Sequence, residues 1–345
     1  MAWLSGWSYR RKITISGSSG AGTDYQVLLK IGESSGTTGC HFHLDGKSAN
    51  FPSGKNQGGD LRFTASDRTT LLSFWVESVS GTSPNRVAYV WVKVSADLGT
   101  NQDIYCYFRN PSASNGSSGV STFLFFDDFE GTTLDTSKWN WINYGGTYSI
   151  ANSLLTVYDT GGDLNQSGIR TVNYKPPANT AIETRGRGYS LSESSPYGQI
   201  FWVILADVNN TCVQQTKNLH FLYDDRYTDD IRHQSGSGGA WGTEDVVYSS
   251  YAQNTWRIGR CILKASSQDW YVLLDDRSVE GSLLNNTDAP QNFAGNYYLG
   301  LEGRQGYVDF DWVLVRKYIS PEPAFSSAGR IEVFASSRRL LLMPI

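Results

Sequence analysis

The sequence predicts an all-β protein made of two β-sandwich modules. Short runs of alternating apolar and polar residues recur along the chain, and an apolar spacing of 3.6 residues nowhere persists for three helical turns. Aromatic residues make up 13% of the sequence and glycine occurs 35 times, whereas charged residues reach only 18%. Ordinary soluble proteins carry roughly 25% charged residues. This composition favours strands joined by long polar loops.

Two related segments mark the limits of the second module. Residues 123–131 and 307–315 are both rich in aromatic residues and carry carboxylates at alternate positions. Strand-like sequence fills the interval between them, which is typical of a sandwich whose first and last strands lie side by side. We therefore divide the chain into a module of residues 1–121, a module of residues 122–323 and a C-terminal tail of residues 324–345.

The first module contains six predicted strands in order along the chain. Alternation of apolar and polar residues places them at 7–15, 25–31, 60–64, 72–77, 87–94 and 103–108. Residues 17–22 and 32–59 are rich in turn-forming residues and are expected as loops. The small, turn-prone residues of 111–119 end the module.

The second module continues with short strands separated by Gly, Asn, Asp and Ser. Besides the two limiting segments, the predicted strands lie at 154–158, 181–189, 200–207, 219–223, 255–263, 270–274 and 297–302. Regular short strands with such punctuation indicate a sandwich or a jelly roll. Pro321 and Pro323 end the last strand. In the tail, residues 330–334 and 339–343 are expected as extra strands or as interface strands that pair with a neighbouring chain.

The charge balance and the termini restrict the choice of partners. The net charge is −4 and no long basic run occurs, so a nucleic-acid partner held through its phosphates is not expected. No stretch approaches the roughly 20 apolar residues of a membrane helix, and membrane insertion is not expected either. The first residues lack the pattern of a signal peptide. We expect a removed leader, or a protein that reaches its site without one, as virion proteins do.

The four cysteines give no metal or redox motif. Cys40, Cys106, Cys212 and Cys261 form no Cys-x-x-Cys pair. Cys106 and Cys261 lie in strand-like runs and are predicted to be buried thiols. A bond between Cys212 and Cys261 remains an alternative, because spacing alone does not decide pairing.

Parts of the first module resemble a known family. Residues 7–15, 59–64, 74–77 and 104–111 are similar to the domain of unknown function DUF2341. Such domains occur in archaeal and bacterial surface proteins and in some viral proteins. The resemblance implies a protein located extracellularly, at the cell surface or on a virion surface, and it implies no catalytic residues.

The second module resembles the concanavalin A-like (laminin-G-like) superfamily of jelly rolls. The similarity lies in residues 126–131, 134–139 and 309–313. It implies a protein that adheres to or binds carbohydrate, with a glycan or a cell-surface polysaccharide as partner. Glycosidases of this fold carry a Glu-x-Asp-x-x-Glu strand, and no such strand occurs in this sequence.

The limiting strands carry the carboxylates that predict a metal site. Alternate residues of a strand share a face, so Asp128 pairs with Glu130 and Asp309 with Asp311. If the two strands are neighbours, the four carboxylates converge on one hard cation, and the sequence predicts a structural calcium ion. On the last strand, Val308, Phe310, Trp312 and Leu314 are then expected on the buried face. The alternative is a solvated acidic edge neutralised by Arg316 or Lys317.

Two other patterns offer metal ligands but favour ordinary loops. Cys40, His41 and His43 lie within four residues, yet a fourth zinc ligand is not evident. The acidic run of residues 224–230 lacks the spacing of an EF-hand.

Aromatic residues in loops are the predicted ligand contacts, because the apolar faces of sugar rings stack on Trp and Tyr. Trp141, Tyr144, Tyr227 and Trp241 lie in loop-like contexts, the last of them in the glycine-rich segment 235–242. By contrast, tryptophans within strand-like runs are expected in the core; these are Trp202, Trp256, Trp270 and Trp312.

These observations predict a non-catalytic surface protein that binds carbohydrate or mediates adhesion through the jelly-roll module. The first alternative is a structural subunit of a virion, fibre or surface filament, in which copies of the chain form a homo-oligomer. The second is a glycoside hydrolase or lyase of the same fold. Hydrolysis requires two carboxylates across a cleft, and the pairs Glu183 with Glu193 and Glu244 with Asp245 show no sign of such convergence in sequence.

Overall fold

A computed structural model describes residues 2–159, 166–189, 199–212, 218–225, 229–289 and 294–334. The protein is all-β, as predicted, and the helix α1 (Gly119–Thr122) is a single turn. The chain forms two compact units. The first contains residues up to Phe123 together with the described residues from Ile319 onward, and the second runs from Leu124 to Tyr318. No helix of the described residues is long and apolar enough to span a membrane.

The first unit is a sandwich of a five-stranded and a four-stranded sheet. The five-stranded sheet consists, in spatial order, of β24 (Ala324–Val333), β1 (Tyr9–Ser16), β8 (Gln102–Phe108), β4 (Arg62–Thr64) and β5 (Leu71–Leu72). The four-stranded sheet consists of β3 (Phe42–His43), β2 (Tyr25–Gly32), β7 (Val87–Val94) and β6 (Phe74–Ser80). Alternate apolar side chains of both sheets, such as Ile13 and Val90, form one buried cluster.

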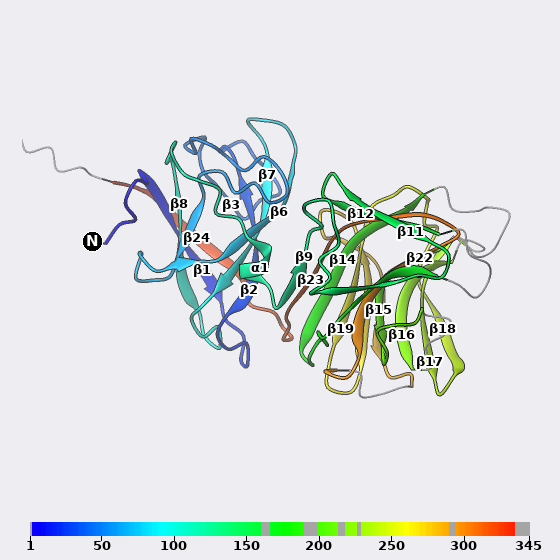
Figure 1. Cartoon of the computed structure of the whole chain (residues 1–345). Coiled ribbons are helices and arrows are strands. Elements are labelled where there is room, and N and C mark those ends of the chain that lie inside the picture. Colours follow the sequence, from blue (N-terminus) through cyan, green and yellow to red (C-terminus); the bar gives the residue numbers. More distant parts are fainter. Residues whose placement is uncertain are drawn as a thin grey trace, which may run out of the picture. The chain divides into compact units, whose positions relative to one another are not determined.

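The strand β24 comes from the segment that the sequence assigned to a tail. It pairs antiparallel with β1 along its length, with Tyr9 opposite Val333 and Ser16 opposite Ala324 (Figure 1). Arg11 Nε also donates to the carbonyl of Gly329 at 2.7 Å. Residues that follow the second unit in sequence therefore complete a sheet of the first unit. The second predicted tail strand, residues 339–343, lies outside the described residues.

The second unit packs a seven-stranded sheet against an eight-stranded sheet. The seven-stranded sheet consists of β10 (Trp139–Ile142), β13 (Ser167–Thr171), β22 (Tyr298–Arg304), β15 (Gln199–Ala206), β16 (Leu219–Asp225), β17 (Asp230–Ser237) and β18 (Ala240–Ser249). The eight-stranded sheet contains β11 (Thr147–Ala151), β12 (Leu154–Asp159), β23 (Gly306–Lys317), β14 (Thr180–Tyr189), β19 (Arg257–Leu263), β20 (Gln268–Leu273) and β21 (Val279–Asn286), with β9 (Phe125–Asp127) paired to β23. Facing side chains such as Trp202 and Trp270 fill the space between the sheets.

The first and last strands of this unit lie side by side, as the two related segments predicted. β9 runs antiparallel to β23, with Asp127 opposite Val313 and Phe125 opposite Val315 (Figure 1). The two ends of the second unit therefore meet within one sheet, which allows a compact unit to be inserted between β8 and β24 of the first unit.

A β-bulge changes which side chains of β23 face the core. The register against β14 shifts between Arg185 and Gly186, which lie opposite Trp312 and Phe310. Val308 and Phe310 belong to the core cluster, but beyond the bulge Val313 and Val315 take over. The expectation that Trp312 and Leu314 share the core face with Phe310 was wrong, because one extra residue reverses the alternation. Both residues are nevertheless fully buried.

The glycine-rich segment 235–242 is a hairpin tip. β17 and β18 pair with Ser237 opposite Ala240, and the two residues between them, Gly238 and Gly239, have φ values of +62° and +88°. Two consecutive residues with positive φ are characteristic of tight hairpin turns. A loop is expected here from the sequence. Trp241 lies instead at the start of strand β18, directly after the turn.

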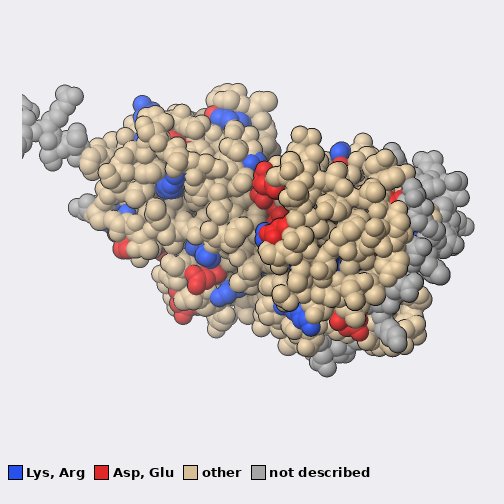
Figure 2. All heavy atoms as spheres, in the orientation of Figure 1, with Lys and Arg blue, Asp and Glu red and all other residues tan. Residues whose placement is uncertain are grey.

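The four cysteines form no disulfide bonds, and the surface drawn in Figure 2 shows no concentration of basic charge. Of the four, Cys106, Cys212 and Cys261 are buried. On the face drawn in Figure 2, Lys and Arg are scattered among uncharged residues and form no continuous basic patch.

Candidate functional site

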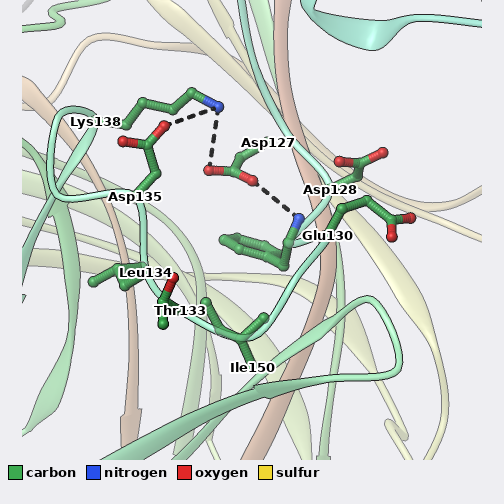
Figure 3. A pocket seen from close by; sticks show the side chains of 9 residues that line it. Asp127, Asp128, Glu130, Thr133, Leu134, Asp135, Lys138 and Ile150 are labelled. Carbon is green, nitrogen blue, oxygen red and sulfur yellow. Dashed lines mark hydrogen bonds and ion pairs between the residues drawn. The ribbon is translucent and has the colours of Figure 1, made fainter.

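An acidic cavity of about 160 Å³ lies beside β9. Its lining includes Asp127, Asp128, Glu130 and Asp135 together with Lys138. Lys138 Nζ lies 3.5 Å from Asp127 Oδ2 and 3.7 Å from Asp135 Oδ2, while Asp128 and Glu130 lie away from that lysine (Figure 3). Asp127 also accepts a hydrogen bond from Trp139 Nε1 at 2.7 Å. Two of the four predicted calcium ligands therefore line a common cavity.

The other two predicted calcium ligands are bound to arginines. Asp309 Oδ2 lies 2.9 Å from Arg187 Nη2, and Asp309 Oδ1 accepts from the Thr156 hydroxyl. Asp311 Oδ2 lies 2.8 Å from Arg185 Nη1. The predicted set of Asp128, Glu130, Asp309 and Asp311 does not form one tight cluster among the described residues. A calcium ion held by these four groups stays a prediction.

The side of the seven-stranded sheet that faces away from the core between the sheets carries a continuous row of large polar and aromatic side chains, most of them buried. Register places Glu302 of β22 opposite Phe201 of β15, Phe201 opposite Tyr223 of β16, and Tyr223 opposite Arg232 of β17. Their neighbours in sequence, such as Leu301, face the core between the sheets. We call this surface the outer face of the seven-stranded sheet.

Aromatic rings form one half of the outer face. The ring centroids of Phe201 and Tyr223 lie 5.8 Å apart, and those of Phe221 and Tyr223 lie 5.1 Å apart. Phe221 meets the edge of Trp241, whose ring centroid is 6.1 Å away. Trp241 is 45% exposed, whereas the other three rings are buried. The aromatic cluster therefore extends from the sheet surface to solvent at the hairpin of β17 and β18.

A buried ion pair forms the other half of the outer face. Arg170 Nη2 lies 2.7 Å from Glu302 Oε1, and both side chains are fully buried. Next along β22, Arg304 Nη1 donates to Gln199 Oε1 at 3.3 Å. Removal of two charges from water costs several kcal/mol per ion, so a buried ion pair is weak evidence of stabilisation.

Tyr144 is half-buried, and its backbone N–H donates to Ser167 Oγ at 3.1 Å. Burial raises the pKa of its phenol.

A second charged group lies near the aromatic half. Arg232 contacts Glu244 Oε2 at 3.2 Å and Asp230 Oδ2 at 3.1 Å. Glu244 also accepts a hydrogen bond from the Tyr223 hydroxyl. Burial raises the pKa of Glu244.

The structure separates the predicted ligand contacts. Trp241 lies on the outer face, where its ring meets Phe221, whereas the contact found for Tyr144 is the hydrogen bond of its backbone to Ser167. Trp141 pairs in register with the core residue Ile169 and packs against the core, 4.8 Å from the ring of Tyr148. Tyr227 lies outside the described residues.

Sequence reasoning missed the strand residues of this surface. Alternation in residues 299–304 does place Leu299 and Leu301 on one face and Glu302 and Arg304 on the other. That signal identifies polar positions, but it does not show that they are buried and paired with residues of other strands.

The other tryptophan and histidine predictions had mixed outcomes. Trp202, Trp270 and Trp312 are buried, but Trp256 is only half-buried and lies beneath the guanidinium groups of Arg185 and Arg187. In the segment of residues 40–43, the His41 ring stacks on Phe325. His43 forms an ion pair with Asp45.

One group of described residues has the donor set and spacing of a metal site. His233, Asp245 and Asp288 place three ligand atoms within 4.8 Å of one another, and no other group of three or more such side chains does so in the described ranges.

Comparison with known proteins confirms the DUF2341 resemblance. Residues 57–142 match the family model of that domain of unknown function. The match begins in the first unit and ends at Ile142, the last residue of β10 in the second unit. No curated protein matches the chain.

Several solved structures are similar to part of the chain. One comes from work on endo-acting O-glycanases of human gut microbiota that initiate mucin breakdown, with 12% identity over 57% of this chain and 100% of that chain and a TM-score of 0.44. A laminarinase from Flavobacterium sp. UMI-01 has 14% identity over 56% and 100%, with a TM-score of 0.42. The carbohydrate binding module CBM66 from Bacillus subtilis has 13% identity over 53% and 98%, with a TM-score of 0.38. Likenesses of this degree assign no ligand and no reaction to this chain.

Proposed function

We propose that this protein binds glycans without cleaving them, through the outer face of the seven-stranded sheet. The observation that carries the proposal is the continuity of that face. An exposed tryptophan, Trp241, leads through Phe221 and Tyr223 to the buried pair of Glu302 and Arg170. Ligand sites typically combine aromatic walls with a few fixed polar groups.

The two halves of the face match the two chemical sides of a sugar. The apolar face of a pyranose ring packs on an aromatic ring, and Trp241 is the exposed ring of this cluster. Hydroxyl groups donate to carboxylates and accept from guanidinium groups, and the partly exposed pair of Glu244 and Arg232 offers both kinds of partner, whereas Glu302, Arg304 and Gln199 are buried.

The arginine partners favour binding over hydrolysis. Glu302 is bound to Arg170, and Glu244 and Asp230 are both bound to Arg232. A nearby positive charge favours the ionised carboxylate, whereas a glycosidase needs one carboxylic acid that donates a proton and a second carboxylate across the scissile bond. Glu244 is the strongest candidate for such an acid, because burial raises its pKa.

We also propose that the second unit is a concanavalin-like jelly roll and that the protein acts in adhesion at an extracellular, cell or virion surface. The paired first and last strands and the two packed sheets of seven and eight strands support the fold proposal. The low content of charged residues supports the location. A structural subunit of a virion, fibre or filament is the alternative.

A glycan-array screen of the full chain tests the proposal. We expect saturable binding to a restricted set of glycans, and no release of reducing ends from those glycans during prolonged incubation. Release of reducing ends that is lost in Glu244→Gln would make the protein a hydrolase. Absence of binding to every glycan, together with a large defined assembly in solution, would leave the structural subunit.

A further inference from the structure

A histidine and two aspartates converge at one edge of the second unit. His233 of β17 lies directly opposite Asp245 of β18, so both side chains share the inner face of the sheet. Asp288 follows the end of β21 in the other sheet. His233 Nδ1 lies 3.8 Å from Asp245 Oδ2 and 4.0 Å from Asp288 Oδ2. These separations are too long for hydrogen bonds.

The imidazole of His233 has one satisfied and one unsatisfied nitrogen. Its Nε2 lies 3.1 Å from His220 Nδ1. Its Nδ1 has no hydrogen-bond partner, and the whole side chain is shielded from solvent. An unsatisfied polar group in a buried position is unfavourable. The nitrogen that lacks a partner is the one that faces both carboxylates.

We infer that His233, Asp245 and Asp288 form a binding site for a divalent transition-metal ion, with zinc as the best match. Zinc binds imidazole nitrogen and carboxylate oxygen at about 2.0–2.2 Å in a tetrahedral arrangement, which sets ligand atoms about 3.4 Å apart. The two distances from His233 Nδ1, 3.8 Å and 4.0 Å, exceed that spacing by about half an ångström, so both carboxylates would move toward the ion. Asp245 and Asp288 are partly exposed, which gives the ion a path of entry and lets the side chains adjust. Calcium prefers a shell of oxygen ligands.

The surroundings of His233 supply the outer shell that metal-binding histidines usually have. His220 stacks on His233, with ring centroids 5.4 Å apart, and its Nε2 lies 3.5 Å from Gln268 Nε2. Gln268 Oε1 accepts from Trp270 Nε1, and the Trp270 ring lies 4.9 Å from that of His233. Because the amide nitrogen of Gln268 can only donate, His220 Nε2 is an acceptor and His220 Nδ1–H donates to His233 Nε2, so His233 carries its proton on Nδ1 in the metal-free protein. Zinc would replace that proton, and Nε2–H of His233 would then donate to His220. Such partners fix the orientation and tautomer of a ligating histidine.

The second and third ligands are also held in place. Asn286 Nδ2 donates to Asp288 Oδ2 at 2.8 Å. β21 approaches β18 so closely that a Cβ at Gly281 would lie 2.1 Å from the carbonyl oxygen of Val247. The carboxylate oxygens of Asp245 and Asp288 lie within 4.8 Å of each other, and two like charges at this distance repel each other. A divalent cation between them would neutralise both.

The site joins the edges of the two sheets and lies behind the aromatic half of the outer face. Asp245 points to the site, whereas its neighbour Glu244 accepts from Tyr223 on the opposite face of β18. A bound ion would therefore stabilise the strand that carries Trp241 and Glu244. The inference does not depend on the proposed glycan binding, because it concerns the uptake of metal alone.

Zinc binding by the metal-free full chain tests the inference. After dialysis against EDTA and then against buffer, native mass spectrometry and calorimetric titration with ZnCl2 should show one ion per chain and a rise in Tm. CaCl2 and MgCl2 should produce neither effect. In Asp245→Asn and Asp288→Asn the zinc affinity should fall at least about tenfold, because even mutation of a residue that only supports a metal ligand typically costs that much.

Matched variants make the result specific. Glu244→Gln removes a carboxylate from the same strand but from its other face, and should keep the zinc affinity. His43→Gln alters the histidine and aspartate pair of the first unit, and should also keep it. Both asparagine variants should be at least as stable as the metal-free protein, since they remove the repulsion. Zinc uptake that persists in both asparagine variants, or is lost in His43→Gln, would overturn the inference, as would the absence of stoichiometric binding.

Discussion

At the scale of single residues, Glu183 shows how neighbouring arginines stabilise a buried carboxylate. Glu183 is fully buried in β14 and contacts three arginines: Arg277 at 2.6 Å, Arg260 at 2.9 Å and Arg316 at 3.0 Å. Glu183 is also one member of the candidate hydrolytic pair with Glu193, which lies outside the described residues. A carboxylate held by three arginines acts as a counter-ion that fixes three strands or loops, so we assign it to stability.

Glu183→Gln should destabilise the second unit by about 3–5 kcal/mol, because it leaves buried arginine charges without a counter-ion. Urea denaturation at pH 7 measures the change. The exposed carboxylate of Glu130 provides the control, since Glu130→Gln in EDTA should change the stability by less than about 0.5 kcal/mol.

The pH dependence of the same variant gives a second check. Burial alone would raise the pKa of Glu183, but the charges of Arg260, Arg277 and Arg316 outweigh it and hold that pKa well below its ordinary value. The group therefore contributes stability that is complete above the unfolded-state pKa of about 4.3 and is lost as the pH falls below it. The stability difference between wild type and Glu183→Gln should be constant from pH 7 to pH 5 and shrink toward pH 3. A difference that stays constant to pH 3 would show that the charge of Glu183 is not responsible.

At the scale of strands, the sequence predicts local elements better than their partners. Alternation located residues 87–94 and 255–263, which the structure shows as β7 (Val87–Val94) and β19 (Arg257–Leu263). It did not locate the full length of β24 or its pairing with β1, because pairing between distant strands leaves no local periodicity. The bulge in β23 was not predicted either, because one inserted residue leaves no distinctive local pattern in the sequence. Glu302 was missed because its partner Arg170 lies on another strand.

Gly259 of β19 makes a specific prediction about packing between the sheets. A Cβ at this position would lie 2.6 Å from Trp202 Cβ, which belongs to the opposing sheet. Gly259→Ala should therefore destabilise the second unit by about 1–3 kcal/mol through overpacking. Gly329 of β24 is the matched strand glycine, because its nearest contact would be Lys12 Cβ at 3.5 Å. Chemical denaturation should show Gly329→Ala unchanged or slightly more stable; equal effects of the two variants would contradict this packing.

At the scale of the whole molecule, the chain leaves one unit, builds another and returns. β24 adds the last strand of the five-stranded sheet after the second unit is complete. Arg10, which is fully buried, depends on this return because its guanidinium lies 2.6 Å from Glu332 Oε2. The second unit has both of its ends in one sheet, where β9 pairs with β23.

A chain that ends at Tyr318 should lose stability in the first unit only. Loss of β24 leaves Arg10 without its counter-ion and exposes the edge of β1, so we expect a loss of at least about 3 kcal/mol or failure of that unit to fold. Calorimetry should show the transition of the second unit unchanged. Glu332→Gln in the full chain gives a milder version of the same test, and a simultaneous loss of both transitions would contradict the division into two units.

The most direct test of the central claim takes the glycan that binds most tightly in the array and compares its affinity for the wild type, for a tryptophan variant and for a tyrosine variant. Trp241→Ala removes the exposed ring of the outer face, and Tyr307→Ala removes a comparably exposed ring from the other sheet, where Tyr307 is 37% exposed. Tryptophan is enriched among the contact residues whose truncation costs more than 1 kcal/mol, so calorimetry should show at least about a fivefold rise in Kd for Trp241→Ala. Tyr307→Ala should bind like wild type. An unchanged Kd in Trp241→Ala, or a higher Kd in Tyr307→Ala alone, would contradict the assignment of glycan binding to this face.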